Sequence, residues 1–405
     1  MQRIILIIIG IIVSSYAYSQ EYVRMMENKT ANFYEIQEAF YKHWENKSYE
    51  RGKGWKQFKR WEYLMEARVD ENGNFPDPSL AWNEHLKFHQ KYNTSKAKSG
   101  AKSSNWTPLG PQSWNSIGWN PGIGRINVVA VDPNNSNVIF VGAPAGGCWK
   151  STNGGNSWMP LTDTLATLGV SGIAINPQNS NEIYLATGDG DGSDTYSIGV
   201  IKSIDGGNTW QSTGLNWSTS QSRVMNKIII NPINPAILYV ATNNGLWKTS
   251  NSGTSWISVR NGVFRDVEFN PLNPTTVFAC TNTNFFKSVD GTSFSMITSG
   301  LPSISQIGRM SIAVTADDTN YVYALATNSS DNGFLGLYRS TNGGNSFTLR
   351  ANTPNIMGWN TSGSDSGGQG WYDLALAVSP TNKNELFTGG VNVWKSLDGG
   401  ANFFA

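Results

Sequence analysis

Cysteine and histidine are scarce in this sequence, and charged residues are few. The 405 residues include two cysteines and three histidines, and Lys, Arg, Asp and Glu together make up 15%, against about 25% in ordinary soluble domains. All three histidines lie between residues 43 and 89, so the 301 residues from 105 onward contain none. This excludes a Ser-His-Asp triad or a histidine metal site confined to that larger part.

A concentrated basic surface is also missing. Residues 105–405 carry 14 basic and 17 acidic side chains, a net charge of −3, and no run of Lys or Arg. Proteins that bind nucleic acid need a basic patch or stripe to meet the phosphates. We therefore expect no nucleic-acid partner.

Long apolar runs are absent except at the start of the chain. Arg3 is followed by the apolar run Ile4–Val13, and Ala17–Ser19 offer a small-residue cleavage site before Gln20. Residues 1–20 therefore predict a signal peptide and a protein secreted to the exterior or the cell surface. The alternative is a membrane anchor, but ten apolar residues are too few for a bilayer, which needs about 20. We expect no membrane span in the rest of the chain.

Residues 21–92 have the apolar spacing of amphipathic helices. The basic and aromatic stretch 53–61 favours a solvated helix face, with contact to an acidic surface as the alternative. Residues 93–104 are polar and small, which predicts a linker. The predicted apolar stripes are Phe33, Ile36, Phe40 and Trp44; Trp55, Phe58, Trp61 and Leu64; and Ala81, Phe88 and Tyr92.

Residues 105–405 repeat an octet of the form STNGGNSW, and two β-rich runs around a turn precede most copies. The mean spacing of the octets is 49 residues. Four short strands in a repeat of about 50 residues predict an all-β fold, a β-propeller of four-stranded antiparallel blades. The octets begin at Ser151, Ser203, Thr249, Ser288, Ser340 and Ser396, so six blades are visible.

Each octet is expected to form the hairpin between the third and fourth strands of its blade. The glycines supply positive φ angles and the Asn or Asp caps turn amides, while Trp158, Trp210 and Trp256 are expected to be buried between blades. A side chain repeated in every blade indicates construction of the blade rather than catalysis. The two cysteines, Cys148 and Cys280, fall in blades one and four, which favours free buried thiols over a disulfide.

The ends of the repeat array bear on ring closure. Residues 105–109 resemble the start of a fourth strand at 157–161, yet no third strand precedes them. The sixth blade begins its own fourth strand at Phe403. Either a seventh blade is missing from a sequence truncated at its C-terminus, or two segments compete for one position. We favour the first, with seven blades in the intact protein.

The octet resembles the Asp-box, or BNR repeat, of sialidases, xyloglucanases and the sortilin family of propellers. The resemblance covers about residues 105–405. This part of the sequence is most similar to secreted bacterial sortilin-type and xyloglucanase-type propellers. It implies the fold, but not the activity, because the box in those families lies on the rim, away from the ligand.

Comparison with the enzymes of these families gives only partial matches. The sialidase pattern Arg-Ile-Pro is met by Arg125, Ile126 and Asn127, without the proline, and the further arginines Arg223, Arg265 and Arg309 are not in one register. Xyloglucanase-type enzymes carry an acid in a Thr-Asp-x-Gly-Gly stretch, which here reads 143–147 with Pro144 in place of the acid. Asp163 or Asp373 could substitute, although no acid pair is evident from spacing.

A secreted binding propeller that captures a glycan, peptide or protein partner is our main prediction, and a xyloglucanase-like glycoside hydrolase is the alternative. Two long aromatic loops enter inner strands on one face, where aromatic rings stack sugars or grip peptides. The alternative for each tryptophan is packing within its own loop. The predicted ligand-binding residues are Trp114, Trp119, Arg125, Trp359, Trp371 and Asp373.

An acidic loop in the second blade predicts a calcium site. Asp189, Asp191 and Asp194 place three carboxylates within six residues, with Ser193 as a further oxygen, and calcium takes six to eight oxygen ligands. Asp194 stands where an EF-hand has glycine, and Val200 where it has the closing glutamate. The alternative is a solvated acidic loop. No other cofactor is expected.

Overall fold

The computed structural model describes residues 21–27, 31–49, 54–77, 79–91, 124–165, 167–192 and 194–405. The chain divides into two units, the first ending at Phe75 and the second starting, apart from residues 51–53, at Pro76. The predicted signal peptide and linker lie outside the described residues. None of the described helices is long and apolar enough to cross a membrane.

The first unit contains α1 (Glu21–Glu27), α2 (Phe33–Trp44) and α3 (Trp55–Glu66). Asn32 begins α2 with a capping box, in which its side chain accepts from the Tyr34 N–H. All four residues of the first predicted stripe are buried, and Phe40 stacks on Phe58 of α3 with ring centroids 3.7 Å apart. The first stripe is confirmed.

The second unit contains α4 (Leu80–Lys91) and the propeller. The predicted stripe of α4 is wrong, because Ala81 and Phe88 are exposed and Trp82 instead packs against a propeller core cluster. Trp82 is therefore the aromatic residue that places this helix on the propeller core.

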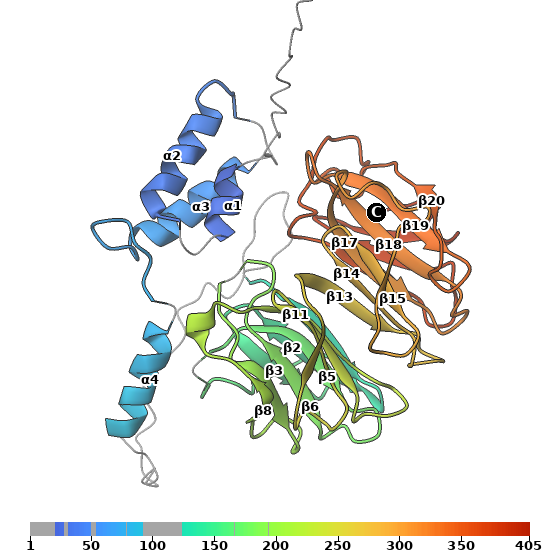
Figure 1. The fold of residues 1–405 in the computed structure, drawn as a ribbon, viewed down its shortest axis with the longest axis horizontal. Coiled ribbons are helices and arrows are strands. Elements are labelled where there is room, and N and C mark those ends of the chain that lie inside the picture. Colours follow the sequence, from blue (N-terminus) through green and yellow to red (C-terminus); the bar gives the residue numbers. More distant parts are fainter. Residues whose placement is uncertain are drawn as a thin grey trace, which may run out of the picture. The chain divides into compact units, whose positions relative to one another are not determined.

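The propeller is all-β, as predicted, with six antiparallel blades whose strands pair in chain order (Figure 1). The sixth has three strands, and Phe404 pairs with Lys395 at the fourth position. The blades are β1 (Val128–Asp132), β2 (Asn135–Ala143), β3 (Gly147–Ser151), β4 (Met159–Pro160); β5 (Val170–Ile175), β6 (Ile183–Thr187), β7 (Gly199–Ser203), β8 (Gln211–Asn216); β9 (Met225–Ile230), β10 (Leu238–Thr242), β11 (Gly245–Thr249), β12 (Ile257–Arg260); β13 (Phe264–Phe269), β14 (Val277–Thr281), β15 (Phe285–Ser288), β16 (Ser295–Ile297); β17 (Ile307–Val314), β18 (Val322–Asn328), β19 (Phe334–Ser340), β20 (Thr348–Ala351); β21 (Ala375–Val378), β22 (Leu386–Gly389) and β23 (Val393–Ser396).

The inner strands contact one another in the order β1, β5, β9, β13, β17 and β21. Five core clusters lie between consecutive blades, each built from the apolar side chains of two neighbours. The hydrophobic core is therefore a series of layers between sheets, and each of the four interior blades is stabilised by the blades on its two sides.

The octets form the hairpins after the third strands, as predicted. In the second blade, Asp205 accepts from the Thr209 N–H at 2.9 Å and from the Ser203 hydroxyl at 2.7 Å. Hydrogen bonds from Thr209 and Ser203 lower the pKa of Asp205 to about 2. The octet geometry is therefore fixed by one carboxylate or amide per hairpin.

The predicted burial of the octet tryptophans is wrong. Trp158 is 39% exposed, and Trp210 and Trp256 are half-buried, whereas the smaller Phe294 and Phe347 are buried. The position lies at the rim, where an indole extends beyond the core and a phenyl ring does not.

The cysteine prediction is confirmed. Cys148 and Cys280 are free and buried. Burial raises the pKa of the Cys148 thiol to about 12, so it remains protonated and unreactive at neutral pH.

Candidate functional site

The candidate site is formed by the loop between β6 and β7, here called the blade 2 loop (residues 188–198), together with loops that enter inner strands. Glycine is needed at two of its positions. A Cβ on Gly190 would lie 2.3 Å from Asn226 Oδ1, and a Cβ on Gly192 would lie 2.9 Å from Asp189 Oδ2. The alternating Gly and Asp residues thus allow close packing of the loop against its neighbours.

Three arginines from other blades hold the blade 2 loop. Arg125 lies 2.6 Å from Asp189 and 3.2 Å from Asp194. Arg309 lies 2.8 Å from Asp191, and the Arg265 guanidinium donates to the Gly190 carbonyl at 2.9 Å. Because these arginines come from the first, fifth and fourth blades, the loop connects blades that are not neighbours in the chain.

Asp189 is the centre of this arrangement. Its side chain is fully buried and accepts the N–H groups of Gly192 at 3.0 Å and Asp194 at 3.1 Å, besides Asn127 at 3.2 Å. Asp194 is more exposed, and burial together with Asp189 raises its pKa, against the effect of Arg125. The first carboxylate therefore shapes the loop, and the second faces the solvent side.

The three predicted calcium ligands are all paired with arginine, and Ser193 lies outside the described residues. Within the described part of the chain, no three acidic, histidine or cysteine side chains are arranged to hold a metal ion. One oxygen of each of these carboxylates is paired with a guanidinium group. The calcium site stays a prediction of the sequence.

A calcium titration tests that prediction directly. Since Arg125 and Arg309 neutralise these carboxylates, we expect millimolar calcium to produce no binding heat and no shift in melting temperature. Arg125→Gln, which frees Asp189 and Asp194, is the matched variant in which calcium binding could appear. Saturable heat with the unaltered protein, lost on Asp191→Asn, would contradict the pairing interpretation and support the calcium site.

The sixth blade contributes an aromatic and acidic segment just before β21. Burial, followed by the nearby charge of Asp191, raises the pKa of Asp373 to about 6, although Arg309 and Arg125 oppose this. The Arg125 guanidinium lies over the Tyr372 ring, 5.1 Å from its centroid. The Trp371 and Tyr372 rings are 5.2 Å apart. A carboxyl group with a raised pKa thus belongs to the same short segment as two partly exposed aromatic residues.

The structure brings together some of the predicted ligand-binding residues. Arg125, Trp371 and Asp373 belong to this cluster, since Arg309 also donates to the Trp371 carbonyl at 2.9 Å. The Trp359 N–H donates to Asp365 at 2.7 Å, within its own loop. Trp114 and Trp119 lie outside the described residues.

Sequence reasoning missed Tyr372 and the holding role of Arg265 and Arg309. These contacts could have been predicted from the opposite charges of the acidic blade 2 loop and of the arginines that open the inner strands. The stretch 143–147, where xyloglucanase-type enzymes have an acid, also contacts the loop, because the Thr195 hydroxyl donates to the Pro144 carbonyl at 2.7 Å.

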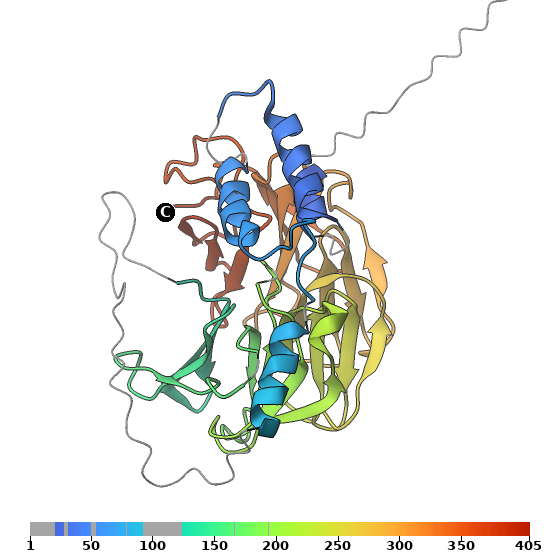
Figure 2. The same cartoon turned by 90° about the vertical axis from the view of Figure 1, so that its left-hand side faces the viewer.

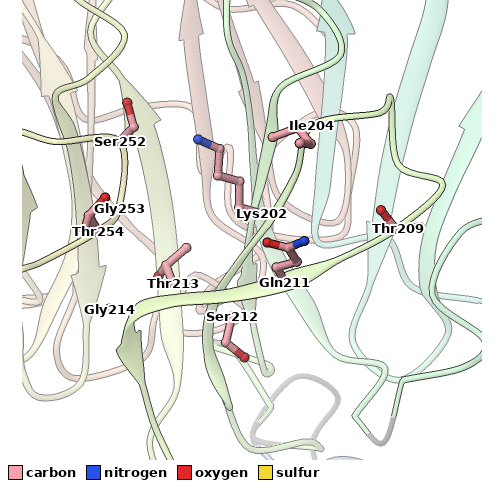
Figure 3. A pocket seen from close by; sticks show the side chains of 10 residues that line it. All are labelled: Lys202, Ile204, Thr209, Gln211, Ser212, Thr213, Gly214, Ser252, Gly253 and Thr254. Atoms are coloured by element: carbon pink, nitrogen blue, oxygen red, sulfur yellow. The ribbon is translucent and has the colours of Figure 1, made fainter.

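A pocket lies at the octet end of the propeller, between β8 and the octet hairpin of the third blade (Figure 3). Its volume is about 340 Å³, and its lining is mostly small and polar, with Lys202, Gln211, Thr213 and Thr254. Lys202 is paired with Glu182 at 2.6 Å. No aromatic ring lines it, so it offers less to a sugar than the loop face does.

No protein family model matches this chain. A xyloglucanase of Paenibacillus sp is 28% identical over 156 residues, which cover 36% of this chain and 15% of that enzyme. A xyloglucanase of Hypocrea jecorina is 26% identical over 152 residues, 34% of this chain and 18% of that enzyme. The matched region is thus less than a fifth of each of these relatives.

Solved structures extend the similarity over most of the propeller. The GH74 xyloglucanase from Xanthomonas campestris superposes with a TM-score of 0.54 and 17% identity, over 69% of this chain and 45% of that one. An ancestral GH74 enzyme gives a TM-score of 0.57 and 21% identity, over 75% and 40%. The fold is therefore a propeller that resembles those of GH74 xyloglucanases.

Proposed function

We propose that this chain is a glycan-acting propeller of the glycoside hydrolase type, and that the glycan is a β-linked glucan of the xyloglucan kind. The observation that carries the proposal is Asp373, a carboxyl group whose pKa is raised by burial and by the nearby Asp191, in the same segment as the pair of aromatic residues Trp371 and Tyr372. The similarity to xyloglucanases supports the substrate class. We also propose that residues 1–20 direct its export.

The chemistry follows from the two carboxyl groups. Glycoside hydrolysis needs one protonated carboxyl group to donate to the leaving oxygen and one ionised carboxylate to assist attack. Asp373, with a pKa of about 6, is partly protonated in mildly acidic solution, while Asp191 is paired with Arg309 at 2.8 Å. In this proposal Asp373 is the proton donor, Asp191 is the second carboxylate, and the aromatic rings stack on the sugar.

Release of reducing ends from xyloglucan by the purified full chain tests the proposal. We expect activity to fall as the pH rises above about 6, because the donor must be protonated. Asp373→Asn should lower the rate by about 100-fold or more, as loss of a general acid does, and leave binding in place. Asp163→Asn, an exposed aspartate that sequence reasoning also considered, is the control and should change neither.

A binding propeller without hydrolysis is the second candidate. Pro144 occupies the position of the acid in xyloglucanase-type enzymes, and its carbonyl is engaged by Thr195. Slower migration of the unaltered protein through a gel that contains xyloglucan, with no reducing ends released, would select this candidate. If the protein neither binds nor hydrolyses any β-glucan, the proposed function is wrong.

A further inference from the structure

Arg309 lies in a β-bulge at the start of β17. The register of β17 against β18 shifts between Ile307 and Met310, and the Thr327 hydroxyl accepts the Arg309 N–H at 2.8 Å. A bulge turns a side chain away from the direction that a regular ladder would give it. Arg265 lies in the corresponding bulge of β13. Two neighbouring blades therefore carry an arginine at the same structural position, and the contacts of the two can be compared.

The two ends of the Arg309 guanidinium bind different blades. One nitrogen lies 2.8 Å from Asp191 of the blade 2 loop. Another donates to the Trp371 carbonyl at 2.9 Å and to the Tyr372 carbonyl at 3.0 Å, in the segment before β21. The fifth blade, in orange, lies beside the sixth, in dark red (Figure 2), and β17 contacts β21. One planar guanidinium group therefore connects the blade 2 loop to the sixth blade.

Arg265 binds the same loop in a different way. Its guanidinium donates to the Gly190 carbonyl at 2.9 Å and to Asn282 at 2.8 Å. These contacts join the blade 2 loop to the fourth blade. Arg309 differs because it binds both segments that carry the carboxyl groups of the candidate site.

The contacts of Arg309 act on both of these carboxyl groups. Asp191 is bound directly, and Asp373 follows Tyr372, whose carbonyl Arg309 binds. Burial raises the pKa of Asp373 and Asp191 raises it further, while Arg309 and Arg125 lower it. Tyr372, whose own pKa is raised by burial, is the titratable group beside Asp373 in the chain. Arg309 therefore affects the placement of both carboxyl groups and the charge around one of them.

We propose that Arg309 is a positioning residue, which holds Asp191 and the segment of Asp373 at a fixed separation. This inference rests on the proposed function, in which these two carboxyl groups act together. Their separation decides whether both can reach the glycosidic bond, since glycoside hydrolases keep such a pair about 5 to 9.5 Å apart. The Arg309 side chain is only 14% exposed, so it acts through the carboxyl groups and not on the sugar.

The titration of Asp373 in the full chain tests this without relying on activity. Arg309→Met removes a charge that lowers the pKa of Asp373 and leaves Asp191 without its partner. We therefore expect that pKa to rise from about 6 by about one pH unit. Carbon-13 NMR of labelled aspartate carboxyl groups measures it, and Asp373→Asn assigns the signal. Arg265→Met is the matched control, which should leave the pKa of Asp373 at its value in the unaltered protein.

Release of reducing ends from xyloglucan gives the second measurement. In Arg309→Met we expect kcat to fall by about 100-fold, the cost of displacing a reacting group by about 1 Å. KM should change little, and the remaining activity should persist to a higher pH because the proton donor has a higher pKa. Arg309→Lys keeps the charge but loses the planar fork, so it should restore the titration of Asp373 and not the rate.

Three results would overturn the proposal. They are an unchanged pKa of Asp373 in Arg309→Met, an equal rise of that pKa in Arg265→Met, and a full rate in Arg309→Lys, because a point charge would then suffice. If Arg309→Met does not fold, Arg309→Gln replaces it. An unaltered protein that releases no reducing ends would refute the hydrolase proposal alone, since the titrations still decide whether Arg309 holds the two segments.

Discussion

Alanine at Phe278 is expected to lower the free energy of unfolding by about 3 to 5 kcal/mol, the usual cost of truncating a buried phenylalanine. Phe278 is fully buried. It lies in the cluster between the fourth and fifth blades, where its ring centroid is 6.0 Å from that of Phe285. Its removal leaves a cavity that neighbouring β-strands, fixed by their hydrogen bonds, cannot close.

The matched control is Phe387→Ala, the equivalent position in the sixth blade. Because Phe387 is 42% exposed, its truncation removes fewer contacts and should cost less than about 1.5 kcal/mol. Chemical denaturation of both variants, with equal slopes against denaturant, gives the two values. Equal losses of stability in the two variants would show that Phe278 and Phe387 are equally buried in solution, which would contradict their difference in exposure.

The fold was predictable because its signals are local. Each octet carries its own glycines and capping side chain, so Asp205 and its Thr209 partner lie within one hairpin, and six such hairpins determine the architecture. The depth of burial was not predictable to the same degree. Trp210 and Phe294 occupy equivalent octet positions, yet the first is half-buried and the second buried, since ring size relative to the rim decides the outcome.

The candidate site was less predictable because its contacts are long-range. Asp189 meets Arg125 across 64 residues of sequence, and Asp191 meets Arg309 across blades. The acidic loop by itself fits either a cation site or a loop held by arginines. Only the arrangement of blades around the axis distinguishes these, and spacing along the chain does not contain it.

A partly buried ionic cluster, with Asp266 at its buried centre, holds three consecutive inner strands together. Lys227 of β9 lies 2.6 Å from Asp266 and 2.5 Å from Glu268, both on β13. Asp266 also accepts the Ser311 hydroxyl and the Ile312 N–H of β17, each at 2.9 Å. Burial acts to lower the pKa of Lys227, but the two carboxylates outweigh it and raise that pKa.

Methionine at Lys227 is expected to lower the free energy of unfolding by about 3 kcal/mol near pH 7. Removing one partner of a buried ion pair leaves uncompensated charge and costs about 3 to 5 kcal/mol, and we take the lower end because Lys227 is 33% exposed. Lys383→Met is the matched control. Its partner Asp318, at 2.9 Å, is 27% exposed, against 9% for Asp266, so loss of this pair should change the stability much less.

The loss caused by Lys227→Met should depend on pH. Burial and Asp266 already raise the pKa of Glu268 in the folded protein, against the effect of Lys227, and removal of the lysine raises it further. The unfolded pKa of a glutamate is about 4.3. Because the pKa of Glu268 is higher in the folded protein, ionisation of this group opposes folding. The stability lost by Lys227→Met should therefore be largest above the folded pKa of Glu268 and should shrink toward pH 4. Parallel stability curves for the variant and the unaltered protein between pH 4 and 8 would show instead that the lysine acts through packing rather than charge.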